Sequence, residues 1–333
     1  MTTINDVAKL ANVSKSTISY VFSNKRTVSP MVRERVLKAC RELSYTPNFF
    51  AVNMFSNNSN LIGLFFEPNN ANYYPFYNDV IQACIISLQK FGMRVIPYLN
   101  VTQEDIVTML KNRRAPIMGA IILAPQVLDE RIKLFTKDNL PFVLIGEPEK
   151  RIGNLLNVDN DNSGLTKRIF SYAYENGHRN ILFINAVSEL TIAKYREKAL
   201  GKFIVAHPDL HVKTIHVVNE PGRVYEELST DGNDYSCVIT ASDVMAKDVY
   251  EFYTEQGMEL GRDVSVIAFG GDERNGLIPK LTIARQNYPE ICASAVDLLI
   301  KLLKSETKPP AETVLIPSEL IIGGSVADIN IRS

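Results

Sequence analysis

The chain has 333 residues and a formal net charge of −1, from 36 basic and 37 acidic side chains. This length exceeds what one compact core usually needs, so we expect two or three domains. No apolar run approaches the ~18 to 20 residues of a membrane helix, and the N-terminus lacks the basic-then-apolar pattern of a signal peptide. The sequence therefore favours a cytoplasmic protein with no membrane partner.

Charge is distributed unevenly along the chain. Residues 1–50 hold eight basic and three acidic side chains, a net +5, which leaves 28 basic and 34 acidic side chains, or −6, for the rest. A small basic module on an acidic body is typical of a protein that binds a polyanion such as nucleic acid. On charge alone, a solvated basic face is the alternative.

Signatures of catalysis are absent from the sequence. The four cysteines are scattered without metal-ligand spacing and are expected to be reduced core thiols: Cys40, Cys84, Cys237 and Cys292. There is no GxGxxG, GxxxxGK[ST], GxSxG or HExxH string. We therefore predict no catalytic residue, no metal site and no cofactor, and the protein is not expected to be an enzyme.

The first 45 residues predict three short helices with recognisable start signals. Thr3 followed by Asp6 resembles a capping box, Ser14 can cap the second helix, and Ser29 precedes a proline at the first helical position. The predicted helices cover residues 4–11, 15–23 and 30 to about 44. Their apolar positions are expected to converge on one small core made of Ile4, Val7, Ala8, Ala11, Val13, Ile18, Val21, Val32, Val36, Leu37 and Leu43.

A tight turn joins the first two helices, at a position where Asn12 tolerates a left-handed backbone. Two helices joined in this way and followed by a supporting helix form a helix-turn-helix, whose second helix enters the major groove of DNA. Ile18 and Val21 would then face inward, and the polar side chains outward. The residues predicted to contact DNA in this module are Thr3, Lys15, Ser16, Thr17, Ser19, Tyr20 and Asn24.

From residue 60 onward, apolar runs alternate with amphipathic stretches. The predicted strands are 61–66, 94–99, 119–124, 141–146, 180–184, 212–217, 237–240 and 264–269, and helices are expected near 76–91, 103–113 and 129–138. This alternation predicts two doubly wound lobes, each a parallel sheet covered by helices on both faces. Ligands of such sheets collect at the carboxyl ends of the strands, so a cleft between the lobes would suit a small polar molecule.

Several stretches together resemble the lactose-repressor (LacI/GalR) family of bacterial transcription regulators. They are residues 4–11, 13–19, 45–48, 177–179, 245–246, 263–267, 279–283 and 285–286. The resemblance implies a helix-turn-helix headpiece at 1–46, a hinge helix and linker at 47–59, and a core at 60–333 resembling periplasmic sugar-binding proteins. In that core the N-lobe would span about 60–157 and 288–317, and the C-lobe about 158–287 and 318–333.

The resemblance further implies a homodimer that binds double-stranded operator DNA and represses carbohydrate-utilisation genes under a sugar-like effector. A phosphosugar effector, a protein corepressor and a small-molecule receptor that does not bind DNA are the alternatives. The hinge would add Asn48, Ala51 and Met54 to the DNA contacts, with Met54 at the position of the family leucine that wedges into the minor groove. Tyr20 stands where the family commonly has an arginine that reads guanine. We expect Tyr20 to contact a phosphate or a thymine methyl, and the alternative is a solvent-edge aromatic that stabilises the helix.

The effector residues implied by the resemblance are Phe76, Tyr77, Glu147, Arg196, Lys198, Ser242, Asp243 and Asp272. Gly270 stands where the family usually has an aspartate that accepts from sugar hydroxyls. The family arginine aligns with Lys198, and Arg196 nearby is the alternative. For Phe76 and Tyr77 the competing interpretation is packing at a helix start.

Two further motifs have structural alternatives. Asp161 and Asn162, which match a family pair, are as well suited to capping the following helix as to contacting a ligand. His178, after Gly177 at a helix end, is expected to satisfy backbone carbonyls rather than take part in catalysis.

Overall fold

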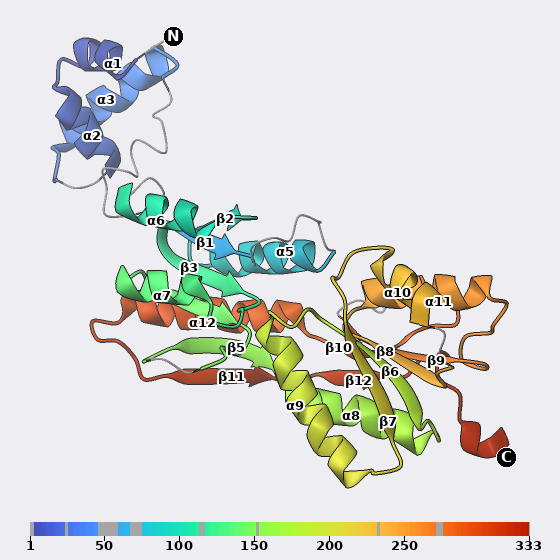
Figure 1. Ribbon diagram of the computed structural model, residues 1–333. Coiled ribbons are helices and arrows are strands. Elements are labelled where there is room, and N and C mark those ends of the chain that lie inside the picture. The colour runs from blue at the N-terminus through green and yellow to red at the C-terminus, as the bar shows by residue number, and fades with distance from the viewer. Residues whose placement is uncertain are drawn as a thin grey trace.

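The computed structural model describes residues 3–23, 26–45, 59–66, 75–112, 117–150, 153–231, 234–270 and 276–332. These residues form a small helical headpiece and a two-lobed α/β core (Figure 1). The predicted fold class is confirmed, with one departure at the edge of the second sheet. Asn24, Asn48, Ala51, Met54 and Asp272 lie outside the described residues.

The headpiece contains three helices, α1 (Ile4–Leu10), α2 (Lys15–Ser23) and α3 (Pro30–Glu42). Their starts were predicted correctly, since the Thr17 N–H donates to Ser14 Oγ at 3.1 Å and the Val32 N–H to Ser29 Oγ at 3.4 Å. The turn between α1 and α2 has Asn12 at φ 48°, also as predicted. The third helix ends slightly earlier than expected.

One cluster of apolar side chains holds the headpiece together. Its buried members are Val7, Ala11, Ile18, Val21, Val36, Ala39 and Cys40. Val32 and Leu37, which we expected in this core, are only half-buried and lie outside the cluster. The inward face of α3 instead follows Val36, Ala39, Cys40 and the partly buried Leu43, at the three- and four-residue spacing of one helix face.

The first core lobe, the N-lobe, is built on a six-stranded sheet in the order β11-β5-β4-β3-β1-β2, with every neighbouring pair parallel. Its strands are β1 (Leu61–Phe65), β2 (Arg94–Tyr98), β3 (Ile117–Leu123), β4 (Phe142–Ile145), β5 (Leu156–Asn160) and β11 (Glu312–Ile316). Its helices are α5 (Pro75–Gln89), α6 (Gln103–Asn112), α7 (Glu130–Lys137) and α12 (Tyr288–Lys304). One apolar core lies between the sheet and α5 with α12, and another lies beneath α6 and α7.

The second lobe, the C-lobe, has a six-stranded sheet in the order β12-β10-β9-β8-β6-β7. Its strands are β6 (Asn180–Asn185), β7 (His211–His216), β8 (Cys237–Thr240), β9 (Ser265–Gly270), β10 (Thr282–Arg285) and β12 (Glu319–Ile321). Its helices are α8 (Asn162–Glu175), α9 (Thr191–Ala206), α10 (Arg223–Asp231) and α11 (Asp243–Glu255), and η1 (Ile329–Arg332) is a short 3-10 turn. Helices α8 and α9 cover one face of the sheet, and α10 and α11 cover the other.

The chain passes between the two sheets three times within the described residues. It leaves the N-lobe sheet after β5, returns after β10, and leaves again after β11. Because β5 continues to Asn160, the first passage lies slightly beyond the boundary expected near residue 157. The edge strand β12 pairs antiparallel with β10, which corrects the expectation of purely parallel sheets.

The expectation for the cysteines has a structural counterpart. All four cysteines are buried and free, as predicted. Within the described ranges, no helix is long and apolar enough to cross a membrane, and no group of three His, Cys, Asp or Glu side chains is placed to hold a metal ion.

Candidate DNA interface and effector cavity

Helix α2 presents its polar residues on the surface of the headpiece and its apolar residues to the core. Lys15 and Ser16 are exposed, while Ile18 and Val21 are almost completely buried. The Ser14 hydroxyl lies 2.7 Å from that of Ser16, so the start of α2 carries a connected group of hydroxyls. Hydroxyls and an ammonium group on the first turns of such a helix can contact base edges and phosphates.

Tyr20 is half-buried on α2 and has a cationic neighbour that we did not anticipate. The guanidinium carbon of Arg26 lies 5.8 Å from the centroid of the Tyr20 ring, a cation–π arrangement. The only sequence signal for this contact is the basic Lys25-Arg26 pair just after the helix. Arg26 therefore brings a guanidinium group close to the tyrosine that replaces the family arginine.

Thr3 is exposed next to the start of α1. Its hydroxyl donates to the Asp6 carboxylate at 2.7 Å, and its backbone N–H donates to the same oxygen at 2.8 Å. These hydrogen bonds hold the pKa of Asp6 below its ordinary value, the side-chain bond from Thr3 being the largest cause. Thr3 thus has a capping role in the free protein, whatever contact it makes with DNA.

A cavity of about 420 Å³ lies between the two lobes. Of the predicted effector residues, four line it: Tyr77, Arg196, Ser242 and Asp243. The polar lining residues that the sequence did not point to are Gln126, Glu189, Asn219, Gln286 and Tyr288. The N-lobe and the C-lobe both contribute, so this inter-lobe cavity has the position expected for an effector site.

Arg196 projects from α9 into this cavity although only 2% of its surface is exposed. Its guanidinium carbon lies 3.6 Å from the centroid of the Phe269 ring, and Nη1 donates to the Ala241 carbonyl across a long 3.4 Å. Its Nε has no hydrogen-bond partner among the described residues. Burial lowers the pKa of Arg196 to about 10, so the group stays charged at neutral pH.

Ser242 and Asp243, at the start of α11, also line the cavity. Ser242 caps this helix by accepting from the Met245 N–H at 3.1 Å, and its hydroxyl donates to Asn219 Oδ1 at 2.5 Å. A Cβ atom at Gly270 would lie 3.3 Å from the Asp243 Cγ and 2.9 Å from Ile283 Cδ1. The absence of a side chain at Gly270 therefore leaves room for the Asp243 carboxylate.

Tyr77 contributes to the cavity wall and to the N-lobe core. Its ring meets that of Phe66 edge to face, with centroids 4.6 Å apart, and it is 2% exposed. Tyr77 therefore lines the effector cavity and also packs in the core near the start of α5, so both interpretations proposed for it describe part of its environment. The side chain of Phe76, also predicted to bind the effector, lies outside the described part of the structure.

Glu147 and Lys198, also predicted to bind the effector, do not line the inter-lobe cavity. Both belong to a different groove, between α8 and α9. Since Arg196 and Lys198 are two residues apart on α9, they point to different sides of the helix. Of these two candidates for the family arginine, Arg196 is the one that lies in the inter-lobe cavity.

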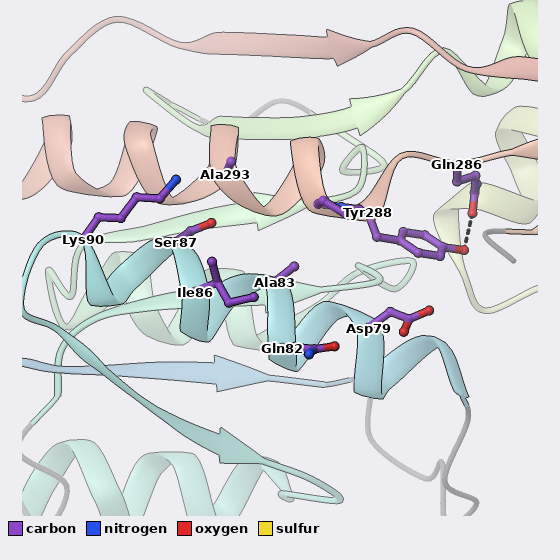
Figure 2. A pocket seen from close by; sticks show the side chains of 10 residues that line it. Asp79, Gln82, Ala83, Ile86, Ser87, Lys90, Gln286, Tyr288 and Ala293 are labelled. Carbon is purple, nitrogen blue, oxygen red and sulfur yellow. Dashed lines mark hydrogen bonds between the residues drawn. The ribbon is translucent and has the colours of Figure 1, made fainter.

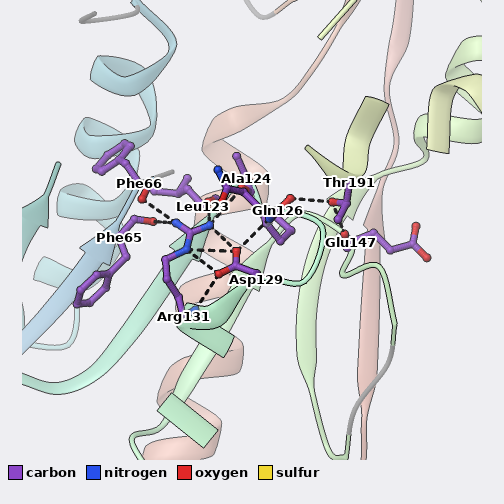
Figure 3. A network of polar contacts seen from close by, with 10 residues as sticks. Phe65, Phe66, Leu123, Ala124, Gln126, Asp129, Arg131, Glu147 and Thr191 are labelled. Atoms are coloured by element: carbon purple, nitrogen blue, oxygen red, sulfur yellow. Dashed lines mark hydrogen bonds and ion pairs between the residues drawn. The ribbon is translucent and has the colours of Figure 1, made fainter. Parts of the chain in front are cut away.

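A buried polar network supports the N-lobe wall of the cavity (Figure 3). Asp129 caps α7 and pairs with Arg131, with Nη2 and Oδ2 2.6 Å apart and both side chains nearly inaccessible. The Arg131 guanidinium also donates to backbone carbonyls at the ends of β1 and β3, namely those of Phe65, Phe66, Leu123 and Ala124. This network fixes the loop that carries Gln126, whose N–H donates to Asp129 at 3.0 Å.

Direct hydrogen bonds join the two lobes beside this network. The Thr191 hydroxyl at the start of α9 lies 3.0 Å from the Pro125 carbonyl and 2.7 Å from that of Glu147, and it can donate to either (Figure 3). The Tyr195 hydroxyl donates to the Pro148 carbonyl at 2.8 Å, and Lys194 pairs with Glu149 at 3.0 Å. The first turns of α9 therefore connect the C-lobe to the loops that follow β3 and β4.

Asp159, at the end of β5, is a buried carboxyl close to the lobe junction. It accepts hydrogen bonds from the Asn160 N–H at 2.7 Å and from Asn162 Nδ2 at 3.0 Å. Burial, with a smaller contribution from Glu147, raises the pKa of Asp159 to about 7 in spite of these bonds and of Arg196. This carboxyl therefore titrates near neutral pH.

Asp161 has the capping role that we weighed, whereas His178 has hydrogen-bond partners that we did not expect. Asp161 caps α8 by accepting from the Gly164 N–H at 2.8 Å. The His178 ring is buried between the Ser236 hydroxyl and the Ala327 carbonyl, each 3.1 Å away. These two partners lie in segments distant from the helix that precedes His178.

A slightly smaller cavity of about 380 Å³ lies between α5 and α12 on the N-lobe (Figure 2). Asp79, Ser87 and Lys90 line it from α5. The Tyr288 hydroxyl donates to Gln286 Oε1 at 2.7 Å, and both of these residues also line the inter-lobe cavity. The two cavities are therefore neighbours that share a wall.

Comparison with known proteins matches both parts of the chain. A family model described as "Bacterial regulatory proteins, lacI family" covers residues 3–48, and a model described as "Periplasmic binding protein-like domain" covers residues 170–326. Among relatives, the "Probable HTH-type transcriptional repressor ExuR" of Bacillus subtilis is 24% identical over an alignment of 340 positions that covers 98% of each chain.

Similar solved structures extend over the headpiece and both lobes. A lac repressor dimer bound to operator and the anti-inducer ONPF is 22% identical, with a TM-score of 0.77 over 98% of this chain and 99% of that one. A complex of the transcriptional regulator CelR with cellobiose is also 22% identical, with a TM-score of 0.70 over 98% of this chain and 100% of that one. At this identity the two structures establish a shared fold.

Proposed function

Because the chain belongs to the LacI family of DNA-binding transcriptional repressors, which are not enzymes, we propose that it represses carbohydrate-utilisation genes as a homodimer on operator DNA. A small sugar-like effector in the inter-lobe cavity would control this binding. The observation that carries the proposal is the buried guanidinium of Arg196, a residue that lines the same cavity as Asp243.

The lining of the cavity favours a neutral polyhydroxylated effector. Among its described lining residues Arg196 is the single cation, while Asp243 and Glu189 are carboxylates. A guanidinium donates to hydroxyl oxygens and a carboxylate accepts from two adjacent hydroxyls, so this pair suits vicinal diols. The apolar lining, which includes Val187, Leu190, Ile192, Val217 and Val218, suits the apolar face of a sugar ring.

A phosphosugar is less suited to the same cavity. Its phosphate would gain one guanidinium partner and would be repelled by two carboxylates in a poorly solvated space. The name of the cellobiose complex, which contains a neutral disaccharide, is consistent with this preference. We therefore place the neutral sugar first and the phosphosugar second for the inter-lobe cavity.

Operator reading is assigned to α2 with a contribution from Arg26. Two headpieces would occupy the half-sites of a pseudo-palindrome, with the start of α2 in the major groove. Tyr20 and Arg26 form one unit at this surface, so we propose that the tyrosine orients a guanidinium that comes from outside the helix. Met54 and the rest of the hinge remain predictions from the sequence.

Effector control follows from the two-lobed core. A ligand that favours one arrangement of the lobes changes the spacing of the two hinges in the dimer, and hence the operator affinity. The coupling is reciprocal: a ligand that weakens operator binding must itself bind the operator complex more weakly. A receptor that does not bind DNA would have no need of the basic headpiece, which makes that alternative the weaker one.

The test is selection of duplexes from a random pool, followed by affinity measurements over a range of salt concentrations. We expect a pseudo-palindromic motif whose affinity falls steeply with salt. Arg26→Gln should relax the preference at one symmetric pair of positions, whereas Lys38→Gln, on the exposed side of α3, should not. Binding without preference for any duplex would contradict the proposed function.

A further inference from the structure

A groove of about 600 Å³ lies between α8 and α9, on the C-lobe. The two helices pack against each other (Figure 1), and the groove is bordered at one end by Glu147 of the N-lobe. Among its lining residues, only Glu147 lies in the N-lobe, and none lines the inter-lobe cavity described above. The α8–α9 groove is therefore a separate site.

The groove is strongly basic. Lys167 of α8 and Lys198 and Lys202 of α9 line it together, and Glu147 is the one carboxylate among its described lining residues. None of these three lysines takes part in an ion pair within the described part of the chain. Lys198 and Lys202 are four residues apart, a spacing at which like charges on a helix repel each other.

This concentration of charge stands out against its surroundings. The chain beyond residue 50 has a net charge of −6. One turn earlier on α9, Lys194 forms an ion pair with Glu149 at 3.0 Å. Of the three lysines at four-residue spacing on this helix, the two that line the groove therefore lack the ion pair that Lys194 has. Three lysines without an ion pair among the described residues line one groove with a single carboxylate, so the groove favours an anion that comes from outside the chain.

The floor of the groove is apolar and aromatic. The Phe203 side chain is buried, and the His207 ring stacks on it with centroids 4.0 Å apart. Tyr195 is half-buried, with its hydroxyl directed to the Pro148 carbonyl. Such a floor accepts the carbon skeleton of a small molecule, while the lysines at the rim reach its charged end.

We propose that the α8–α9 groove binds a small phosphorylated metabolite as a second ligand. The phosphate lies among Lys167, Lys198 and Lys202, and the ring or carbon chain lies on Tyr195 and Phe203. Binding of this ligand does not depend on the function proposed above; only its effect on operator binding does. The groove is the place for the anionic ligand that the inter-lobe cavity disfavours.

Helix α9 connects this ligand to the lobe junction. Arg196 on one side of α9 faces the inter-lobe cavity, and Lys198 and Lys202 on another side face the groove. The same helix is hydrogen-bonded to the N-lobe through the hydroxyls of Thr191 and Tyr195. The acceptor for Thr191 is the backbone carbonyl of Glu147, the residue that borders the groove. A ligand in the groove therefore acts on the arrangement of the lobes.

The experiment is calorimetric titration of the full chain at low salt with glucose 6-phosphate, glucose, inorganic phosphate and sulfate. We expect saturable binding of glucose 6-phosphate that is at least about tenfold weaker in Lys198→Gln/Lys202→Gln. Lys194→Gln on the same helix is the matched control and should bind as wild type does. Arg196→Met should leave this affinity unchanged.

Two outcomes would overturn the proposal. One is the absence of saturable binding of glucose 6-phosphate at millimolar concentration, or binding no stronger than that of sulfate. The other is binding that survives in the double lysine variant and is lost in Arg196→Met, which would assign the phosphate to the inter-lobe cavity. Neither outcome bears on the selection of an operator, so failure here is distinguishable from failure of the proposed function.

Discussion

The inter-lobe cavity and the α8–α9 groove lie on two sides of one helix and differ in the sign of their charge. The cavity has one buried cation and two carboxylates among its described lining residues, whereas the groove has three exposed ammonium groups and one carboxylate. Arg196 and Lys198 are two positions apart in the sequence, yet helical geometry assigns them to different sites. The ligand that a doubly wound lobe accepts is thus decided by single side chains and not by the fold.

The largest expected effect concerns the wall of the cavity. Asp129→Ala removes the carboxylate that pairs with buried Arg131 and caps α7, and it leaves an uncompensated guanidinium. We expect a loss of about 3 to 5 kcal/mol in the free energy of unfolding, measured by urea denaturation. Glu130→Ala, at the next position but on the exposed surface, is the control and should change little. A loss as small as that of the control would show that the network does not support the wall.

The second prediction separates the two sites by their ligands. Arg196→Met removes the cation from the cavity, so the affinity for a neutral sugar found by thermal-shift screening should fall between about tenfold and a hundredfold. Lys198→Met, whose side chain faces the groove, should leave that affinity unchanged. If the lysine variant lost the sugar and the arginine variant kept it, our assignment of the two residues would be reversed.

The third prediction uses pH. Burial raises the pKa of Asp159 to about 7, above the value of about 4 expected in the unfolded chain. Between about pH 4 and pH 7, folding is therefore accompanied by the uptake of a proton by Asp159. Its contribution to stability is therefore favourable at low pH and is lost as pH rises towards 7. Asp159→Asn keeps the acceptor for the Asn160 N–H without a charge.

The advantage of Asp159→Asn over wild type should consequently grow by about 2 kcal/mol from pH 5.5 to pH 7.5. Urea denaturation at both pH values measures this difference. Asp161→Asn, two residues away at the exposed cap of α8, serves as the control for a general effect of removing a carboxylate. A constant difference across this pH range would mean that Asp159 remains ionised in the folded protein.

The smallest effect is expected at the lobe junction. Thr191→Val removes the hydroxyl that contacts the Pro125 and Glu147 carbonyls, at a cost of about 1 kcal/mol to stability. Because these contacts join the lobes, the variant should also change the affinity for the effector. Thr136→Val, whose hydroxyl bonds only within α7, has no such contact and should leave effector affinity intact. Equal effector affinity in both variants would argue against a junction role for Thr191.

Local signals allowed the helix starts and the turn of the headpiece to be predicted from the sequence. Caps at Ser14 and Ser29 and a left-handed Asn12 depend on neighbouring residues alone, and all three were predicted. Most of the predicted strands, such as 61–66 and 119–124, are apolar runs of the kind that buried parallel sheets require. Strand β5 was missed because Leu156–Asn160 mixes apolar with polar residues. Asn157 is buried there because Thr313 on β11 donates to it at 2.7 Å, a contact between distant segments.

The candidate site could be predicted only in part, because several of its contacts join segments that are distant in the sequence. Ser242, Asp243 and Tyr77 follow from the family pattern, but the choice between Arg196 and Lys198 depends on the rotational phase of α9, which the sequence does not contain. Arg131 bonds to carbonyls some 65 residues earlier in the chain, and no local motif signals this. The Arg26–Tyr20 contact likewise joins α2 to a residue beyond its end, and no local motif predicts it.

The central claim is that a ligand in the inter-lobe cavity and operator DNA bind with coupled free energies. The most direct measurement is the selected operator's affinity with and without a saturating neutral sugar, paired with the sugar's affinity with and without operator. Our account predicts the same factor in both titrations, and no coupling when Arg196→Met has lost the sugar. An operator affinity that does not change at saturating sugar would contradict it.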